Sequence, residues 1–215
     1  MNQNGPDIST EVKETPDTTE NQPKFNPQSS KKVADRSSIR VATIGNVDSG
    51  KSTLCGLLSK GIPDDGNGKT RAAVFNYGHE KGTGRTSSIA HEIMGWDEKG
   101  NQQFASHFTD NKQKYWTEVI SKSNKFLNLL DLCGHEKYLK TTMTGLVGLI
   151  PDYSMLIVGA NLGLSKMTKE HMGISLTIKL PFFVIVTKID MVDKAVKEKT
   201  VEDLKRLGGT EPCER

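Results

Sequence analysis

The chain contains 215 residues, of which 34% are hydrophobic and 26% are charged, and its formal net charge is +3. This length suffices for one full α/β core rather than two, and the charge is too small to indicate nucleic-acid binding by its field alone. Neither an apolar run long enough to span a bilayer nor an N-terminal signal pattern occurs, so we expect a soluble, cytoplasmic chain with no membrane partner.

Residues 1–38 are rich in Pro, Ser, Thr, Asn and Gln, and Phe25 is their only aromatic residue. Their five basic and six acidic side chains nearly cancel. Because so little apolar surface cannot offset the entropy of ordering, we expect a disordered polar arm over 1–38. A folded domain over 39–207 and a short tail over 208–215 follow it.

The three cysteines are odd in number and show no C-x-x-C spacing, which disfavours a disulfide framework. Cys133 and His135 stand two positions apart, but no second Cys/His pair completes a tetrahedral set. We therefore expect no zinc site.

Short apolar runs alternate with segments of helical period from residue 39 onward, which is the pattern of a βαβ sheet. Nearly all the strand runs are continuously apolar, so a mostly parallel, doubly wound α/β sheet is predicted. Residues 61–88 are dense in Gly, Asp and charge without a clear period, and are predicted to form a long loop of functional or mobile character. The predicted strands are 39–45, 89–96, 126–131, 153–159 and 182–187, and the predicted helices are 51–60, 113–122, 136–149, 166–178 and 194–207.

The first predicted strand leads into Gly45–Ser52, which matches G-x-x-x-x-G-K-[ST] and precedes a predicted helix. In that context the pattern is typical of a phosphate-binding P-loop, although an ordinary Gly-rich turn is the alternative. Backbone N–H groups would face a phosphate, Lys51 would reach its β/γ oxygens and the Ser52 hydroxyl would meet Mg²⁺. The residues predicted to contact a nucleotide here are Asn46, Val47, Asp48, Ser49, Gly50, Lys51, Ser52 and Thr53.

A second candidate segment is Asp131-Leu132-Cys133-Gly134-His135, directly after a predicted buried strand. Ligands of doubly wound sheets lie beyond the carboxyl ends of the strands, so Asp131 is expected beside the P-loop, where a carboxylate can hold Mg²⁺. Gly134 can approach a γ-phosphate because it has no Cβ, and His135 can orient an attacking water. A helix N-cap aspartate followed by a surface turn is the alternative.

The third segment, Thr187-Lys188-Ile189-Asp190, follows the strand predicted at 182–187. A carboxylate such as that of Asp190 can accept hydrogen bonds from guanine N1–H and N2–H₂, donors that adenine lacks. The aliphatic stem of Lys188 can cover the purine face. Short Lys/Asp turns after strands are common, so the signal comes from the order of all three segments along the chain.

With these motifs, the chain resembles the translational GTPases of the elongation factor Tu superfamily, and most nearly the eukaryotic GTP-binding protein 1/2 group. The resemblance implies a P-loop, Ras-like G domain over 39–207 that hydrolyses GTP to GDP with Mg²⁺ as a monomer engaged with the ribosome and RNA or tRNA. It also implies that 61–88 is switch I. The resemblance rests on five runs of the sequence: GNVDSGKSTL (45–54), GRTSSI (84–89), DLCGHEKYLKTTM (131–143), MTKEHMGISL (167–176) and FVIVTKIDM (183–191).

Carried over by position, the family assigns Lys51 and His135 to hydrolysis, Ser52 and Asp131 to the metal, and Thr187, Lys188 and Asp190 to guanine. The switch I hydroxyl that completes the Mg²⁺ site is expected at Ser88, with Thr86 as the rival. Arg85 then stands where some GTPases carry a catalytic arginine finger, although an exposed arginine that binds RNA phosphates or nothing is the alternative.

The family pattern is incomplete after Asp190, because the Ser-Ala motif, the closing strand and helix, and the barrel domains are not in the sequence. This predicts a truncated G domain with an unpaired sheet edge and weaker GTP binding than a longer form. A GTP-binding regulatory module without turnover is therefore the main alternative. The GTPase-like subunit of sulfate adenylyltransferase is a third possibility, and an ATPase is disfavoured by Asp190.

Overall fold

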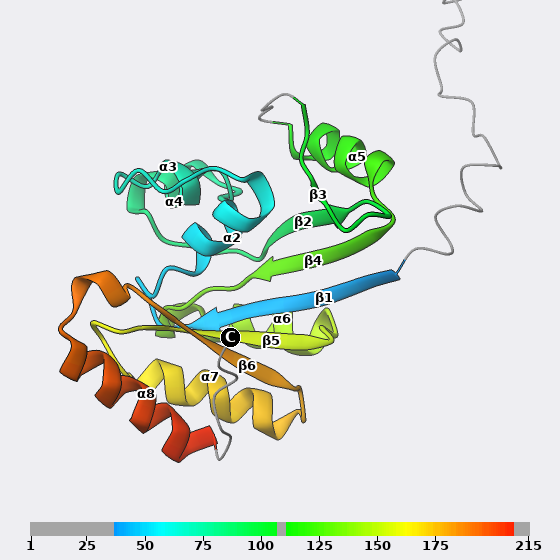
Figure 1. Cartoon of the computed structure of the whole chain (residues 1–215). Coiled ribbons are helices and arrows are strands. Elements are labelled where there is room, and N and C mark those ends of the chain that lie inside the picture. The colour runs from blue at the N-terminus through cyan, green and yellow to red at the C-terminus, as the bar shows by residue number, and fades with distance from the viewer. Residues whose placement is uncertain (1–36, 107–110, 209–215) are drawn as a thin grey trace, which may run out of the picture. The chain divides into compact units, whose positions relative to one another are not determined.

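The computed structural model describes residues 37–106 and 111–208 of the chain (Figure 1). Its sheet contains six strands in the order β3-β2-β4-β1-β5-β6. The strands are β1 (Ser37–Gly45), β2 (Ala90–Trp96), β3 (Gln102–Gln103), β4 (Lys125–Asp131), β5 (Tyr153–Gly159) and β6 (Phe182–Thr187). The helices are α2 (Lys51–Lys60), α3 (Lys69–Ala72), α4 (Gly78–Thr83), α5 (Lys112–Lys122), α6 (Leu139–Gly148), α7 (Lys166–Thr177) and α8 (Lys194–Gly208), with 3-10 turns η1 (Glu136–Tyr138) and η2 (Ile189–Met191).

Strands β1, β4, β5 and β6 run parallel, and only β2 and β3 pair antiparallel to their neighbours. The predicted mostly parallel α/β sheet is therefore confirmed. The register pairs Thr43 of β1 with Asp131 of β4, and Gly159 of β5 with Thr187 of β6. Since parallel strands share a direction, their carboxyl ends meet at one edge of the sheet.

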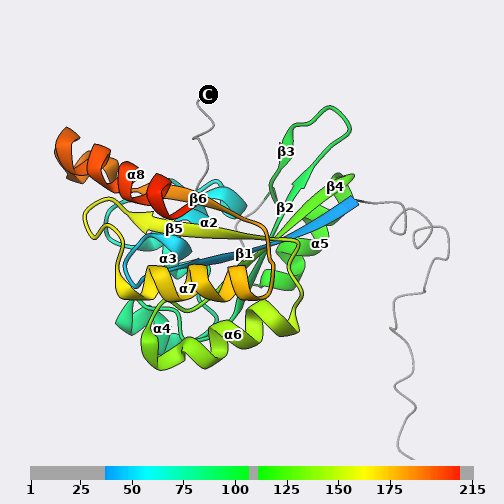
Figure 2. The same ribbon diagram turned by 90° about the horizontal axis from the view of Figure 1, so that it is seen from below.

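Each face of the sheet is covered by helices, as Figure 1 shows with α2 and α5 above the sheet and α7 and α8 below it. Helix α6 packs into the same core as α7 and α8. Alternate residues of β4 enter different cores, because successive side chains of a strand point to opposite faces. Leu129 packs with Cys55 of α2, whereas Leu130 packs with Leu146 of α6. Figure 2 shows α6 and α7 side by side on one face of the sheet.

Within residues 37–106 and 111–208, none of the helices combines the length and the apolar character that a membrane-spanning helix needs.

Each predicted strand and long helix has a counterpart in the structure, although η1 separates from the predicted helix 136–149. The two-residue strand β3 was not predicted, because two residues are too few to show a strand pattern. The expectation of a loop over 61–88 was wrong in part, because α3 and α4 lie within it. Helices of four and six residues are too short to show a 3.6-residue period. Most of the predicted arm over 1–38 and of the tail over 208–215 lies outside the described residues, and only their inner ends belong to β1 and α8.

A buried charge cluster fixes β2 to the helices above it. Glu92 of β2 is fully buried, with Lys60 of α2 at 2.7 Å and Lys112 of α5 at 3.1 Å from its carboxylate oxygens. The Lys60 ammonium also lies 3.7 Å from the centre of the Tyr115 ring. Burial lowers the pKa of Lys60, while Glu92 opposes this shift. Lys60 is held in the core because the Glu92 carboxylate compensates its charge, whereas the Lys112 side chain is 24% exposed and pairs with Glu92 from the edge of the core.

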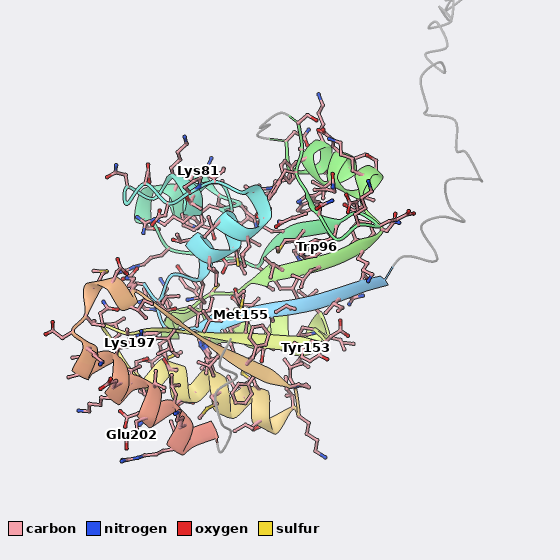
Figure 3. All side chains as sticks on the ribbon, viewed as in Figure 1. Lys81, Trp96, Tyr153, Met155, Lys197 and Glu202 are labelled. Carbon is pink, nitrogen blue, oxygen red and sulfur yellow. The ribbon has the colours of Figure 1, made fainter. Side chains whose placement is uncertain are left out.

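We predict that Glu92→Gln lowers the free energy of unfolding by about 3 kcal/mol, because it leaves the buried Lys60 ammonium without a counter-charge. The measurement is urea unfolding. Glu202→Gln is the matched control, since Glu202 lies exposed on α8 (Figure 3) and its pair with Arg206 is solvent-screened. Equal losses in the two variants would contradict the role given to the cluster.

Candidate nucleotide-binding site

The predicted P-loop forms the turn between β1 and α2 and is closed by its own hydrogen bonds. Asp48 and Gly50 have positive φ angles of 57° and 90°, which turns the backbone sharply before the helix. The Asn46 carbonyl oxygen accepts from Ser49 Oγ at 2.9 Å and from Lys51 Nζ at 2.7 Å. These internal contacts shape the loop.

Lys51 places its ammonium at the inner wall of a cavity of about 540 Å³. The side chain is only 6% exposed, and burial lowers the pKa of Lys51, against the opposing charge of Asp131. The cavity volume falls within the range of small-molecule sites. A buried cation facing such a cavity favours an anionic ligand, which would supply the missing charge.

Three oxygen atoms from distant parts of the chain meet beside Lys51. Ser52 Oγ donates to Asp131 Oδ2 at 2.6 Å and lies 2.7 Å from Thr86 Oγ1. Thr86 Oγ1 lies 3.3 Å from the same carboxylate oxygen. Asp131 is fully buried, and burial raises its pKa although the Ser52 hydrogen bond and Lys51 oppose the shift. We call Ser52, Thr86 and Asp131 the oxygen cluster.

The expectation of Ser88 in this cluster does not fit the structure. Ser88 Oγ donates to Glu80 Oε1 at 2.9 Å and accepts from Asn76 Nδ2 at 3.2 Å. The rival residue, Thr86, occupies the place beside Ser52 instead. The reason is the backbone path after α4, which turns Thr86 inward and Ser88 toward Glu80.

Gly134 allows the loop after β4 to lie against the P-loop. A Cβ at this position would collide with Lys51 Nζ and would lie 2.7 Å from the Gly45 carbonyl oxygen. Only glycine therefore fits without displacing Lys51. His135 follows at the exposed rim of the cavity, and its Nδ1 accepts from the Lys137 N–H at 3.1 Å.

Arg85 lines the same cavity from the end of the 61–88 segment. Its guanidinium lies 3.9 Å from the Asp48 carboxylate, and both side chains are 54% exposed. A loose, solvent-exposed pair of this kind contributes little to stability. The guanidinium is thus free to contact another anion in the cavity.

The third segment divides between the cavity and the P-loop. Lys188 lines the cavity with a left-handed backbone, whereas Asp190 lies exposed in η2 and is not part of the lining. Thr187 was expected to contact the base, but its hydroxyl donates to the Ser49 carbonyl oxygen at 2.7 Å. Since β6 ends beside the P-loop, Thr187 stabilises that loop rather than facing the cavity.

Several residues that the motifs did not identify also shape the site. Thr43 Oγ1 donates to Asp131 Oδ1 at 3.0 Å, and His171 Nδ1 accepts from the Gly45 N–H at 3.2 Å. Arg71 lines the cavity from α3. Thr43 could have been identified as the polar residue within the apolar run Val41–Ile44 of β1, whereas His171 lies in a helix 126 positions from its partner.

The P-loop, the oxygen cluster and the doubly wound sheet define a P-loop nucleotide-binding domain. The family model of the elongation factor Tu GTP binding domain matches residues 36–210. The chain therefore belongs to the elongation factor Tu GTP-binding family of translational GTPases.

Individual relatives agree with this family. The chain is 45% identical to GTP-binding protein 1 of Xenopus laevis over 177 residues, which cover 82% of the chain and 27% of the relative. It is 44% identical to GTP-binding protein 2 of Homo sapiens, over 79% of this chain and 27% of that relative. It is 33% identical to elongation factor 1-alpha of Methanobrevibacter smithii, over 72% of this chain and 33% of that relative. The chain thus spans about a quarter to a third of the length of these relatives.

Solved structures show the same fold. The bacterial selenocysteine-specific elongation factor EF-Sec superposes with a TM-score of 0.57 at 23% identity, covering 80% of this chain and 23% of that one. The elongation factor SelB of Methanococcus maripaludis, in complex with the GTP analogue GppNHp, superposes with a TM-score of 0.50 at 20% identity, covering 80% and 27%. The predicted Ras-like G-domain fold is therefore confirmed.

We predict that His171 makes the stability of the chain fall between pH 7 and pH 5. Burial lowers the pKa of His171 from its ordinary 6.5 to about 4, so the unfolded chain binds more protons in this window and stability decreases as the pH falls. The expected contribution is about 2 kcal/mol.

The measurement compares unfolding of the wild type and His171→Asn at both pH values. Asparagine keeps an acceptor for the Gly45 N–H but does not titrate. His91 and the other titratable groups are present in both proteins and cancel. The same pH dependence in both proteins would show that His171 does not contribute.

Proposed function

We propose that this chain is a GTP-binding and GTP-hydrolysing switch that requires Mg²⁺. The observation that carries the proposal is the oxygen cluster of Ser52, Thr86 and Asp131 beside the buried Lys51 in a single cavity. Membership of the translational GTPase family supports a guanine-nucleotide switch. The three oxygens come from α2, the 61–88 segment and the end of β4, so metal binding would connect the P-loop to the 61–88 segment.

The oxygen cluster suits Mg²⁺ that is bound together with phosphates and waters better than a metal ion whose ligands all come from the protein. No group of three or more His, Cys, Asp or Glu side chains within residues 37–106 and 111–208 could hold a metal ion. Mg²⁺ is commonly bound by one or two protein oxygens together with substrate phosphates and waters. Asp131, Ser52 and Thr86 supply hard oxygen donors of that kind, and the bound ion would neutralise charge that develops on the phosphates.

For hydrolysis, the residues of this chain would mainly position groups and stabilise charge. Lys51 and the P-loop amides would bind the phosphates, and His135 at the rim would orient the attacking water. Arg85, which also lines the cavity, would add positive charge. Gly134 would keep the loop after Asp131 within reach of the γ-phosphate.

The choice of base rests on the third segment. Lys188 lines the same cavity as the P-loop residues, and its stem would cover the purine. Asp190, two residues further on, would accept from the N1–H and N2–H₂ groups of guanine. Thr187 would act indirectly, through its hydrogen bond to the P-loop.

The wider role follows from the family and belongs to the whole proteins of which this chain spans a fraction. We propose that it acts in the cytoplasm with the ribosome and with RNA or tRNA, as expected of a translation factor. The alternative is a GTP-binding regulatory module without turnover. Phosphate release with and without ribosomes separates these two functions.

We predict that His135→Ala binds GTP with unchanged affinity but hydrolyses it about a hundredfold more slowly, because a positioned proton-transfer or water-orienting group contributes that order of rate. The measurement is single-turnover hydrolysis, with affinity from titration of a fluorescent GTP analogue. Lys137→Ala is the control on the same loop. Unchanged hydrolysis in His135→Ala would remove His135 from its role, and absence of turnover in the wild type would favour the regulatory module.

A further inference from the structure

One carboxylate organises the segment that delivers Thr86 to the oxygen cluster. Glu80 of α4 is 0% exposed. Its Oε2 accepts from the N–H groups of Asn76 at 3.0 Å and Tyr77 at 3.1 Å. Its Oε1 accepts from the N–H groups of Ser87 at 2.7 Å and Ser88 at 2.9 Å, and from their hydroxyls at 3.0 and 2.9 Å.

These six hydrogen bonds join the two ends of a loop. Asn76 and Tyr77 precede α4, whereas Ser87 and Ser88 follow the Gly84-Arg85-Thr86 turn. Ser87 is the next residue after Thr86, which is itself only 8% exposed. The position of the Thr86 hydroxyl is therefore set from one side by Ser52 and from the other by the bonds to Glu80.

The loop is also anchored to the rest of the domain. Lys112 of α5 donates to the Val74 carbonyl oxygen at 2.6 Å and to Asn76 Oδ1 at 2.9 Å. Asn76 Nδ2 in turn donates to the Ile89 carbonyl oxygen at 3.0 Å. We call Glu80 and its four hydrogen-bond partners, Asn76, Tyr77, Ser87 and Ser88, the clamp. The clamp is attached to α5 through Lys112 and, since β2 begins at Ala90, to the start of β2 through Ile89.

The chemistry of the clamp suits an ionised carboxylate. Among the described residues, no lysine or arginine forms an ion pair with Glu80. A buried carboxylate without a counter-ion is costly unless hydrogen bonds compensate it. Burial disfavours the charged form of Glu80, but the bonds from Ser87, Ser88 and Tyr77 outweigh it and lower the pKa.

We propose that Glu80 is a positioning residue that holds Thr86 in the oxygen cluster and thereby raises the affinity of the site for Mg²⁺. This rests on the proposed function, in which the cluster holds the metal. A role limited to capping α4 accounts for the bonds from Asn76 and Tyr77 alone. The four donors of Ser87 and Ser88 lie beyond the C-terminal end of α4, where a cap of its first turn needs no partner.

Glu80→Gln tests the clamp with minimal change of shape. The amide of glutamine keeps one acceptor oxygen but replaces the other oxygen by an NH₂ donor. That donor would face N–H donors, so either the bonds from Asn76 and Tyr77 or those from Ser87 and Ser88 must break. We call these two sets of bonds the two junctions. In the full nucleotide-free chain, we expect the amide hydrogens of Ser87 and Ser88, or those of Asn76 and Tyr77, to exchange about tenfold faster, as expected for loss of a hydrogen bond to a charged group. Glu202→Gln is the control.

Protection of the β5 amide hydrogens from exchange shows whether the variant is folded. Unchanged exchange at both junctions with β5 protected would overturn the clamp. Should Glu80→Gln lose protection in β5 as well, the Ser87→Ala, Ser88→Ala double variant removes only two hydroxyl donors and takes its place. Faster exchange of its 87–88 amides then supports the clamp, and unchanged exchange overturns it.

The link to Thr86 is tested by titrating Mg²⁺ into mixtures of the protein and a fluorescent GTP analogue. We expect Glu80→Gln and Thr86→Ala each to raise the Mg²⁺ concentration for half-maximal binding about tenfold. The affinity of Glu80→Gln for the analogue in EDTA should be unchanged, because Glu80 does not line the cavity. The double variant should show the same shift as Thr86→Ala alone, because Glu80 acts through Thr86. Additive shifts of the half-maximal Mg²⁺ concentration in the double variant would overturn the positioning role. A Glu80→Gln variant that only loses affinity for the GTP analogue in EDTA would overturn it as well.

The two hypotheses fail in different ways. Absence of Mg²⁺-dependent nucleotide binding in the wild type would overturn the proposed function and the metal role of Glu80 with it. Wild-type binding that depends on Mg²⁺, together with Glu80→Gln behaviour equal to that of Glu202→Gln, would overturn the positioning role alone.

Discussion

The parallel direction of β1, β4, β5 and β6 is the constraint on which the site depends. Because these strands end at one edge of the sheet, the loops that follow them must share a small volume. Gly134 meets this requirement by lying where any side chain would displace Lys51. Thr187 meets it by donating to the P-loop backbone. Crowding at this edge thus brings residues 45–52, 131–135 and 187–188 together.

That edge carries charges which the protein alone compensates incompletely. Burial lowers the pKa of Lys51 and raises that of Asp131, so each charged form is disfavoured where it lies. A triphosphate and a divalent cation would reverse both effects, because each brings the opposite charge. The site is therefore built for a ligand at some cost in stability, as is common in functional sites. The charge of Glu92, by contrast, is compensated within the protein by Lys60 and Lys112.

The sequence predicted the fold and the central motifs because their signals are local. Strand β5 and helix α2 have the predicted bounds, and the P-loop lies where its pattern placed it. The sequence could not decide between Ser88 and Thr86, since the choice depends on how the backbone turns around Glu80. Nor could it identify His171, whose partner is the backbone of Gly45. Contacts between distant segments leave no spacing pattern in a single sequence.

If the proposed function holds, Ser52, Thr86 and Asp131 surround one divalent metal ion. A crystal structure of the chain with a non-hydrolysable GTP analogue and Mn²⁺, with anomalous diffraction recorded at the manganese edge, would locate that ion. We expect one manganese peak at the oxygen cluster, next to the phosphates. A manganese peak at another site in the nucleotide complex, or bound nucleotide away from Lys51, would contradict this expectation.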